Sequence, residues 1–181
     1  MTRKELRFIT VFMGVVAFVF LAVKFYEANQ VKTKVKALQG GEAAQGYAAP
    51  LFEHSTIKGS KFRLADYKGK VVIINFFASW CPPCIEELPH MIKAQDKYKG
   101  RVQFVGISLD DPDASISLHA FVAEKKINYP VLYVSKEINA SFGKISKIPT
   151  TFILDKELMI IKKVEGYRDK AFFEQEIKAL L

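Results

Sequence analysis

Two cysteines, Cys81 and Cys84, are the residues of this sequence best suited to carry out chemistry, and the chain has no others. Pro82 and Pro83 separate them, and a single C-x-x-C spacing directly after an apolar run is typical of a redox dithiol. The apolar run, residues 71–77, is rich in β-branched and aromatic side chains and predicts a buried strand. We expect a helix next, because a proline at the first helical position loses no hydrogen bond. Cys81 would then lie at a helix N-terminus, where unpaired N–H groups and the macrodipole favour a thiolate.

Two thiols at this spacing can exchange disulfides in two steps. Cys81 would attack a substrate disulfide and form a mixed disulfide, and Cys84, one helical turn further on, would attack that intermediate and release the product. Neither Pro82 nor Pro83 has a backbone N–H to donate to the Cys81 sulfur, so its thiolate has fewer donors than a glycine-containing pair would offer. A strongly oxidising pair needs an unusually stabilised reduced form, and we therefore predict a reductant.

The amino-terminal sequence predicts a membrane anchor. Residues 8–23, FITVFMGVVAFVFLAV, form an uncharged run between Arg7 and Lys24. The run is shorter than the roughly 20 residues of a typical span, but Leu6 and residues 25–26 extend it and the flanking basic side chains can snorkel. A cleaved signal peptide is the alternative. Because no small-residue cleavage site follows the run, we favour an uncleaved signal-anchor.

The chain divides into three predicted parts: a membrane anchor over residues 1–25, a polar linker over 26–48 and a single domain over 49–181. Arg3, Lys4 and Arg7 before the apolar run favour a cytoplasmic N-terminus by the positive-inside tendency, and the lysines that follow the run weaken this asymmetry. A tethered redox domain makes most sense outside the cytoplasm, because disulfides form and persist there.

The charge balance indicates a mildly basic, solvated domain. The chain has 27 Lys and Arg and 19 Asp and Glu, a net charge of +8, and 20 of the basic and 16 of the acidic residues lie from residue 48 onward. No basic run interleaved with aromatic residues occurs, so we expect no nucleic-acid partner.

The domain alternates between predicted strands and helices. Two short segments within residues 51–64 flank a Lys-Gly-Ser turn and indicate a hairpin. Apolar runs predict further strands over residues 71–77, 102–108, 131–134, 150–155 and 159–165. Helical spacing predicts helices from Cys84 to Gly100, through residues 116–122, over 138–142 and after Asp169. This order indicates a mixed α/β sheet covered on both faces.

Two motifs together resemble the thioredoxin fold: WCPPC at residues 80–84 after a buried strand, and IPTTF at residues 148–152. Within that fold, the hairpin from Leu51, the helix and strand between residues 110 and 134, and the anchor are similar to the membrane-anchored thioredoxins of the TlpA/ResA/CcmG type. The resemblance covers residues 49–181. It implies a thioredoxin-like α/β fold with an N-terminal hairpin, a central α/β insertion and an N-terminal transmembrane helix.

Two polar positions extend this resemblance. Asn75 stands where cytoplasmic thioredoxins carry a buried acid beside the dithiol, so that acid is absent here. Glu87, three residues after Cys84, matches the acid of the family's C-x-x-C-x-x-E-x-P pattern, which Pro89 completes. A carboxylate one turn beyond Cys84 could accept its proton, and partial burial would raise the pKa of that carboxyl into a useful range. The alternative for Glu87 is an exposed helix glutamate, as Glu86 is expected to be.

Trp80, Ile148 and Pro149 are the expected substrate-binding residues. The family resemblance implies that Pro149 follows a cis peptide bond and faces the dithiol. Ile148 matches the family position whose backbone pairs with a bound peptide, and as a bare sequence feature it is an apolar loop residue. Trp80 either shields and orients Cys81 or simply packs into the core.

The other polar candidates are expected to have structural roles. His54, His90 and His119 show no ligand-like spacing, which favours surface or packing roles. The run Asp-Asp-Pro-Asp at residues 110–113 suits a turn and a helix cap better than a calcium site. We therefore expect neither a metal site nor a cofactor.

The resemblance implies a thiol-disulfide oxidoreductase that reduces protein disulfides through Cys81 and Cys84. It places the enzyme in a bacterial inner (cytoplasmic) membrane as a single-pass protein, with the catalytic domain on the periplasmic side. Its expected partners are client proteins and a membrane thiol reductant of the CcdA or DsbD type. Cytochrome c maturation is one implied task, in which the haem-binding cysteines of apocytochrome c would be reduced, although the sequence itself selects no client.

Two further function classes remain open at this point. A copper or zinc chaperone would use the same two thiols, but these supply only half of a closed zinc site. Copper chaperones of this fold typically separate their cysteines by three residues and add a downstream histidine. A peroxidase would have Thr or Ser three residues before its reactive cysteine, where this chain has Ala78. Metal titration and assays of insulin-disulfide reduction and peroxide turnover separate the three classes.

Overall fold

The computed structural model describes residues 22–24, 46–113 and 117–181. The chain separates into two compact units, Met1–Ala37 and Leu38–Leu181. In the first unit, residues 22–24 are helical. Within the described ranges, none of the helices combines the length and apolar character needed to cross a membrane. Apart from residues 22–24, the predicted anchor lies outside the described residues, and so does the predicted linker up to residue 45.

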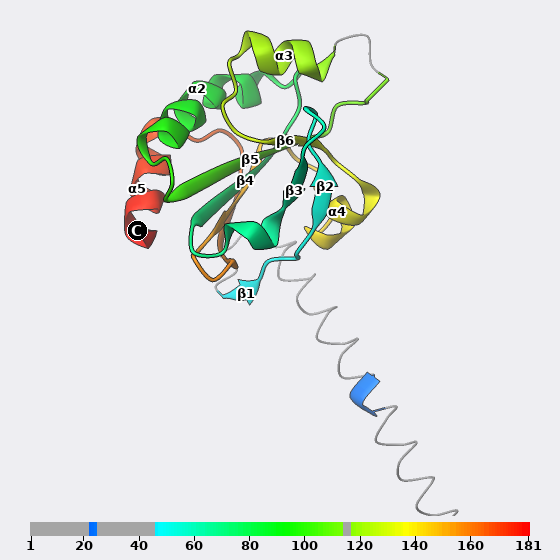
Figure 1. The fold of residues 1–181 in the computed structure, drawn as a ribbon, viewed down its shortest axis with the longest axis vertical. Helices are drawn as coiled ribbons and strands as arrows, with labels where there is room; N and C mark the ends of the chain where they lie inside the picture. Colours follow the sequence, from blue (N-terminus) through cyan, green and yellow to red (C-terminus); the bar gives the residue numbers. More distant parts are fainter. Residues whose placement is uncertain (1–21, 25–45, 114–116) are drawn as a thin grey trace, which may run out of the picture. The chain divides into compact units, whose positions relative to one another are not determined.

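The second unit is built on a six-stranded mixed sheet with the strand order β1-β8-β7-β4-β5-β6 (Figure 1). Its strands are β1 (Tyr47–Ala48), β4 (Val71–Phe77), β5 (Val102–Ser108), β6 (Val131–Tyr133), β7 (Thr150–Leu154) and β8 (Met159–Glu165). Strand β4 pairs parallel with β5 and antiparallel with β7. Strand β5 pairs parallel with β6, and β8 pairs antiparallel with both β7 and β1. The strand that leads to the cysteines therefore lies inside the sheet.

Helices cover both faces of this sheet, and a separate hairpin packs on one of them (Figure 1). The helices are α2 (Pro82–Lys97), α3 (Leu118–Glu124), α4 (Lys136–Ser141), α5 (Lys170–Leu180) and the short 3-10 helix η1 (Leu64–Tyr67). The hairpin pairs β2 (Glu53–Ser55) with β3 (Lys61–Arg63). An isolated bridge between Thr56 and Leu132 joins the hairpin to β6.

The alternation of side chains along β4 creates the two halves of the core. All seven residues of β4 are buried. Val71, Ile73 and Phe77 pack into a cluster with residues of α2, α3 and α5, whereas residues 72, 74 and 76 pack with the hairpin and α4. Each fully buried side chain of this kind contributes about 1.5–3 kcal/mol relative to exposure. Asn75 is the polar exception, and it lies on the α2 face.

The main predictions for the domain are confirmed: a mixed α/β sheet covered on both faces, an N-terminal hairpin, and a helix and strand between residues 110 and 134. Several boundaries differ by one to three residues, and helix α2 ends at Lys97 instead of Gly100. Two differences have an identifiable cause. Strand β1 lies within the predicted linker, because its partner β8 rather than its own sequence pattern specifies it. Helix α4 begins at Lys136 instead of 138, because the Ser135 side chain accepts a hydrogen bond from the Ile138 N–H and caps the helix.

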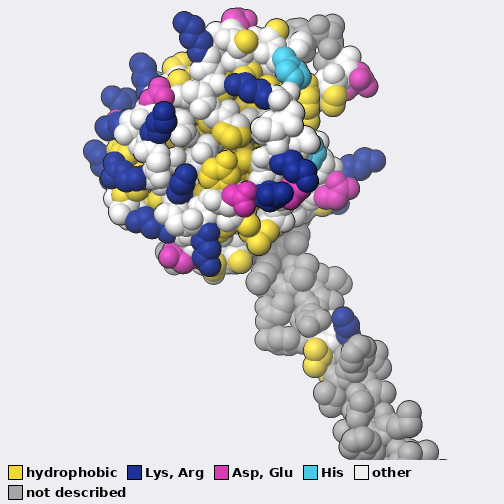
Figure 2. All heavy atoms as spheres, viewed as in Figure 1, with side chains coloured by type: hydrophobic (Ala, Val, Ile, Leu, Met, Phe, Trp, Pro, Cys, Tyr) yellow, Lys and Arg dark blue, Asp and Glu magenta, His cyan; other side chains and the backbone are white. Residues whose placement is uncertain are grey.

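On the face shown in Figure 2, charged side chains are scattered and do not gather in one stripe. Lys and Arg are spread over the face shown in Figure 2, with Asp and Glu among them. Some form ion pairs, such as Lys97 of α2 with Glu174 of α5 at 2.8 Å. Exposed pairs of this kind contribute about 0–1 kcal/mol each, so the charged surface serves solubility more than stability.

Candidate active site

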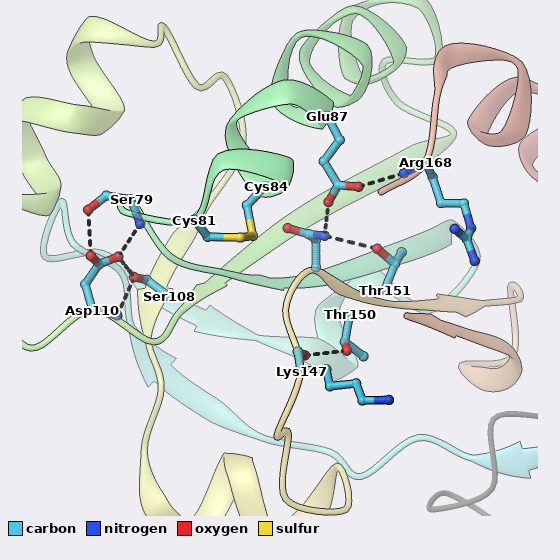
Figure 3. Close-up of a disulfide and its surroundings, with 11 residues drawn as sticks. Ser79, Cys81, Cys84, Glu87, Ser108, Asp110, Lys147, Thr150, Thr151 and Arg168 are labelled. Atoms are coloured by element: carbon cyan, nitrogen blue, oxygen red, sulfur yellow. Dashed lines mark hydrogen bonds between the residues drawn. A yellow bond between two sulfur atoms is a disulfide. The ribbon is translucent and has the colours of Figure 1, made fainter. Parts of the chain in front are cut away.

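Cys81 is the N-cap residue of α2, and Pro82 is the first residue of the helix. The Cys81 N–H donates to the Ala78 carbonyl at 3.2 Å and closes a four-residue turn between β4 and α2. The Cys81 carbonyl accepts the Ile85 N–H at 3.1 Å. A disulfide joins Cys81 to Cys84 (Figure 3). The predicted placement of Cys81 at a helix N-terminus is confirmed.

Glu87 lies fully buried one turn after Cys84, on the same face of α2. Its Oε1 accepts a hydrogen bond from Asn75 Nδ2 at 2.7 Å, and its Oε2 accepts one from the Arg168 N–H at 3.1 Å (Figure 3). Burial raises the pKa of Glu87 to about 7, against the smaller opposing effects of these two hydrogen bonds and the Arg168 charge. The expected burial of Glu87 is confirmed, while Glu86 is exposed. A carboxyl with this pKa can take up and release a proton near neutral pH.

Asn75 connects the helix that carries the cysteines to the sheet. Its Nδ2 also donates to Thr151 Oγ1 at 3.0 Å, and Thr151 is the residue opposite Asn75 in the pairing of β4 with β7. Among the described residues, the buried Oδ1 of Asn75 has no hydrogen-bond partner. Glu87 is thus the ionisable side chain that Asn75 contacts directly.

The Ile148–Pro149 peptide bond is cis, as predicted. Strand β7 begins at Thr150, opposite Phe76 of β4, so these two residues lie beside the chain that leaves β4 toward Cys81. Pro149 is buried, and its carbonyl accepts the Gly166 N–H at 2.7 Å. Ile148 is half-buried and packs against the core cluster that contains both cysteines. In the described part of the chain, the Ile148 N–H and carbonyl have no hydrogen-bond partner.

Trp80 is 64% exposed, although it immediately precedes a cysteine that is only 4% exposed. The core-packing interpretation of Trp80 is therefore wrong. Trp80 is the third residue of the turn Ala78–Cys81, and its side chain lies largely outside the core there. An exposed tryptophan beside a reactive sulfur offers apolar surface to a bound partner.

A second polar cluster beside the cysteines was absent from the sequence predictions. Asp110 Oδ2 accepts hydrogen bonds from the Ser79 N–H at 2.9 Å and from Ser108 Oγ, and Oδ1 accepts one from Ser79 Oγ at 2.6 Å (Figure 3). The assignment of Asp110 to a turn and helix cap is wrong, because its carboxylate is buried against another loop. The feature that could identify this cluster is the parallel pairing of β4 with β5. The two strands end opposite each other, so the residues that follow them lie close together.

The three histidines make separate contacts far from one another in sequence. His54 bonds to the Ser55 carbonyl, His90 to the Tyr167 hydroxyl and His119 to the Ile57 carbonyl. Over residues 22–24, 46–113 and 117–181, no group of three or more His, Cys, Asp or Glu side chains could hold a metal ion.

Comparison with known proteins places this site in a family. The AhpC/TSA family matches residues 45–163. The thiol-disulfide oxidoreductase ResA of Bacillus thuringiensis subsp. konkukian is 34% identical over 137 residues, which cover 75% of this chain and 78% of that protein. The chain belongs to the ResA type of thiol-disulfide oxidoreductase within the AhpC/TSA family. The thioredoxin-like protein YneN of Bacillus subtilis is 36% identical to this ResA-type chain over 134 residues, 74% of the chain and 78% of YneN.

Solved structures agree with the family assignment. A thiol:disulfide interchange protein of the thioredoxin family from Chlorobium tepidum TLS matches the ResA-type chain with a TM-score of 0.70 and 33% identity. The match covers 77% of this chain and 99% of that one. The predicted thioredoxin-like fold and the predicted thiol-disulfide oxidoreductase activity are both confirmed.

Proposed function

We propose that this ResA-type enzyme is a membrane-anchored, extracytoplasmic reductant of protein disulfides. In this proposal Cys81 is the attacking thiol, Cys84 is the resolving thiol and Glu87 accepts the Cys84 proton. The observation that carries the proposal is the fully buried Glu87 one helical turn from Cys84, with its pKa raised to about 7.

The reaction proceeds in two exchanges. The Cys81 thiolate attacks one sulfur of the client disulfide, which breaks that S–S bond and releases the other client sulfur as a thiolate that takes up a proton. The Cys84 thiol then gives its proton to Glu87, and its thiolate attacks the Cys81 sulfur of the mixed disulfide. The client leaves with two thiols, and the two electrons it gained come from the enzyme, which is left with the Cys81–Cys84 disulfide.

Client binding is assigned to Trp80, Ile148 and Pro149. The N–H and carbonyl of Ile148 are free of partners within the described residues, so an extended client segment can pair with them as an added strand. Trp80, the residue before Cys81, provides exposed apolar surface. This arrangement suits varied protein clients, because backbone pairing does not depend on the client side chains.

The start of α2 supports the proposed direction of electron flow. Prolines occupy its first two positions, so neither can donate an N–H to the Cys81 thiolate. A reduced form without those donors is not unusually stabilised, which favours a reductant. Equilibration of the pair with glutathione measures its potential. A value as oxidising as about −120 mV would exclude the proposed direction.

The anchor, the compartment and the partners belong to the same proposal. Residues 8–23 supply the apolar segment that would hold the domain on the periplasmic side of a bacterial inner membrane. The proposed clients include apocytochrome c, and the proposed electron donor is a CcdA- or DsbD-type membrane protein. The variant Cys84→Ser in intact cells stalls the mixed disulfide of Cys81, so the trapped adducts identify the clients. Protease added to spheroplasts should digest the domain; full protection would place it in the cytoplasm.

The decisive assay compares Glu87→Gln with its exposed neighbour Glu86→Gln in insulin-disulfide reduction across pH. With the intact side chain the rate should rise as pH passes about 7, because only the ionised carboxylate accepts the Cys84 proton. Glu87→Gln should lose this rise and react more slowly above pH 7, and Glu86→Gln should keep it. Equal profiles for all three proteins would remove Glu87 from the mechanism. Tight binding of copper or zinc without insulin reduction would instead support the metal-chaperone alternative.

A further inference from the structure

We propose that Asp110 is a positioning residue for the reaction: its buried carboxylate fixes the turn Ala78–Cys81 and thereby the Cys81 sulfur. This role goes beyond the proposed choice of client and direction, because any exchange through Cys81 depends on where its sulfur lies.

Both oxygens of the Asp110 carboxylate accept hydrogen bonds from Ser79. Oδ2 accepts the Ser79 N–H at 2.9 Å, and Oδ1 accepts the Ser79 hydroxyl at 2.6 Å. One acid therefore fixes the backbone and the side chain of the same residue. Ser108 Oγ donates to Oδ2 and accepts the Asp110 N–H at 3.0 Å, which holds the carboxylate itself in place. Asp110 is 6% exposed and Ser108 is fully buried, so water competes little for these bonds.

The hydrogen bonds among Asp110, Ser79 and Ser108 form a clamp that joins the ends of the parallel strands β4 and β5. Phe77 and Ser108, the last residues of β4 and β5, are partners in the register, and the Leu109 N–H donates to the Phe77 carbonyl at 2.8 Å. Beyond that point the two chains diverge, β4 toward α2 and β5 toward α3 (Figure 1). The Asp110–Ser79 bonds extend the connection past the last backbone pair, to within two residues of Cys81.

The start of α2 makes this connection important for the cysteine. The Cys81 N–H closes the turn on the Ala78 carbonyl, and Ser79 is the second residue of that turn. Because the first two residues of α2 are prolines, neither of those positions can hold the Cys81 sulfur by an N–H bond. The backbone that enters the helix then takes a larger part in setting the sulfur's orientation to the helix dipole, and Asp110 fixes that backbone.

The sign of a thiol pKa shift tests this role. Asp110→Asn replaces one acceptor oxygen by an NH2 donor, so it cannot accept all three bonds, and it also removes a negative charge. Loss of the charge alone would lower the pKa of the Cys81 thiol, whereas loss of its orientation to the helix N-terminus raises that pKa. We expect the pKa to rise and insulin reduction to slow by about tenfold, since misplacement of a reacting group by about 1 Å can cost up to about 100-fold.

The pKa would be read from the pH dependence of iodoacetamide alkylation in full-length protein carrying Cys84→Ser, so that the probe reports Cys81 alone. Asp111→Asn is the matched control, because it removes the neighbouring charge from an exposed side chain whose bond is to the Asp113 N–H. It should leave pKa and rate unchanged. An unchanged or lowered Cys81 pKa in Asp110→Asn, with the thermal unfolding midpoint alone reduced, would overturn the proposal and leave Asp110 a structural residue.

A second pair of variants keeps the test informative if Asp110→Asn does not fold. Ser79→Ala removes only the hydroxyl bond and no charge, and Ser79→Thr retains a hydroxyl. We expect Ser79→Ala to shift pKa and rate in the same direction as Asp110→Asn, but by less, and Ser79→Thr to restore both. Identical kinetics for Ser79→Ala and the unsubstituted protein would contradict a positioning role for the clamp.

Discussion

Asn75 Nδ2 donates a hydrogen bond to Glu87 Oε1 at 2.7 Å, and this bond ties the centre of β4 to the helix that carries both cysteines. The bond favours the ionised carboxylate, so it lowers the pKa of Glu87 while burial raises that pKa. Thr151 Oγ1 accepts the second amide N–H at 3.0 Å and orients the amide from β7. Asn75 thus limits how far burial shifts the proton affinity of Glu87.

Replacement of Asn75 by leucine, which has the same branching and no donor, should raise the pKa of Glu87 above about 7. A hydrogen bond to a charged group is worth about 1.5–3 kcal/mol, which corresponds to roughly one to two pKa units. The carboxyl 13C chemical shift of Glu87 across pH measures the change directly. Thr151→Val keeps the Asn75 donor and should produce a smaller shift. A Glu87 pKa unaltered in Asn75→Leu would mean that burial alone sets it.

The stability of the protein should depend on pH through Glu87. Its pKa is about 7 in the folded chain and about 4.3 in an unfolded one. Between those values the folded state holds a proton that the unfolded state lacks, so the stabilising contribution is complete below pH 4.3 and disappears as pH rises through 7. Glu87→Gln should therefore unfold at higher urea concentration than the unsubstituted protein at pH 8. The gain in unfolding free energy is up to about 4 kcal/mol.

That advantage should vanish near pH 4, where both side chains are neutral. Urea titrations of the oxidised protein at pH 4, 6 and 8 provide the comparison. Glu86→Gln, on the exposed face of α2, should show no advantage that grows with pH. If Glu87→Gln were less stable at pH 8 as well as at pH 4, lost packing would outweigh the titration.

The parts of the molecule that local patterns specify could be predicted from sequence. The apolar run of β4 is buried on both faces and reads as a strand, and Asp169 caps α5 as its position suggested. The cysteines and Glu87 were identifiable because they lie on one helix, where spacing alone determines which side chains share a face. Family resemblance added the cis bond before Pro149.

The missing features depend on long-range register or on backbone donors. Asp110 and Ser79 are 31 residues apart, and only the pairing of β4 with β5 brings them together. Glu87 bonds to the Arg168 N–H, 81 residues away. Every residue except proline has a backbone N–H, so the residue type does not reveal this donor. Strand β1 is two residues long and takes its conformation from β8. Trp80 was ambiguous because an aromatic residue after a buried strand can pack inward or turn outward.

Gly106 should resist any side chain, because a Cβ there would lie 2.9 Å from Phe77 Cε1 and 3.4 Å from Val131 Cγ2. Phe77 is buried and packs on Phe121, so its ring has little room to move. We expect Gly106→Ala to reduce the unfolding free energy by about 1–3 kcal/mol. Phe77→Leu should make space for the methyl group, so the double variant should lose less than the sum of the two single variants. If the effects of the two single variants on the unfolding free energy simply added in the double variant, the clash would not be with Phe77.

The cap of α5 should matter for both stability and Glu87. Asp169 Oδ1 accepts the Phe172 N–H at 2.9 Å, and α5 adds Phe173 to the core cluster that contains the cysteines. Arg168, the preceding residue, supplies the N–H that holds Glu87. We expect Asp169→Ala to reduce the unfolding free energy by about 1 kcal/mol and to raise the pKa of Glu87, because the uncapped segment holds the Arg168 N–H less firmly. Asp169→Asn retains a cap acceptor and should leave both quantities nearly unchanged. Equal losses in the two variants would show that Asp169 acts through its charge at the N-terminus of α5 and not through the cap.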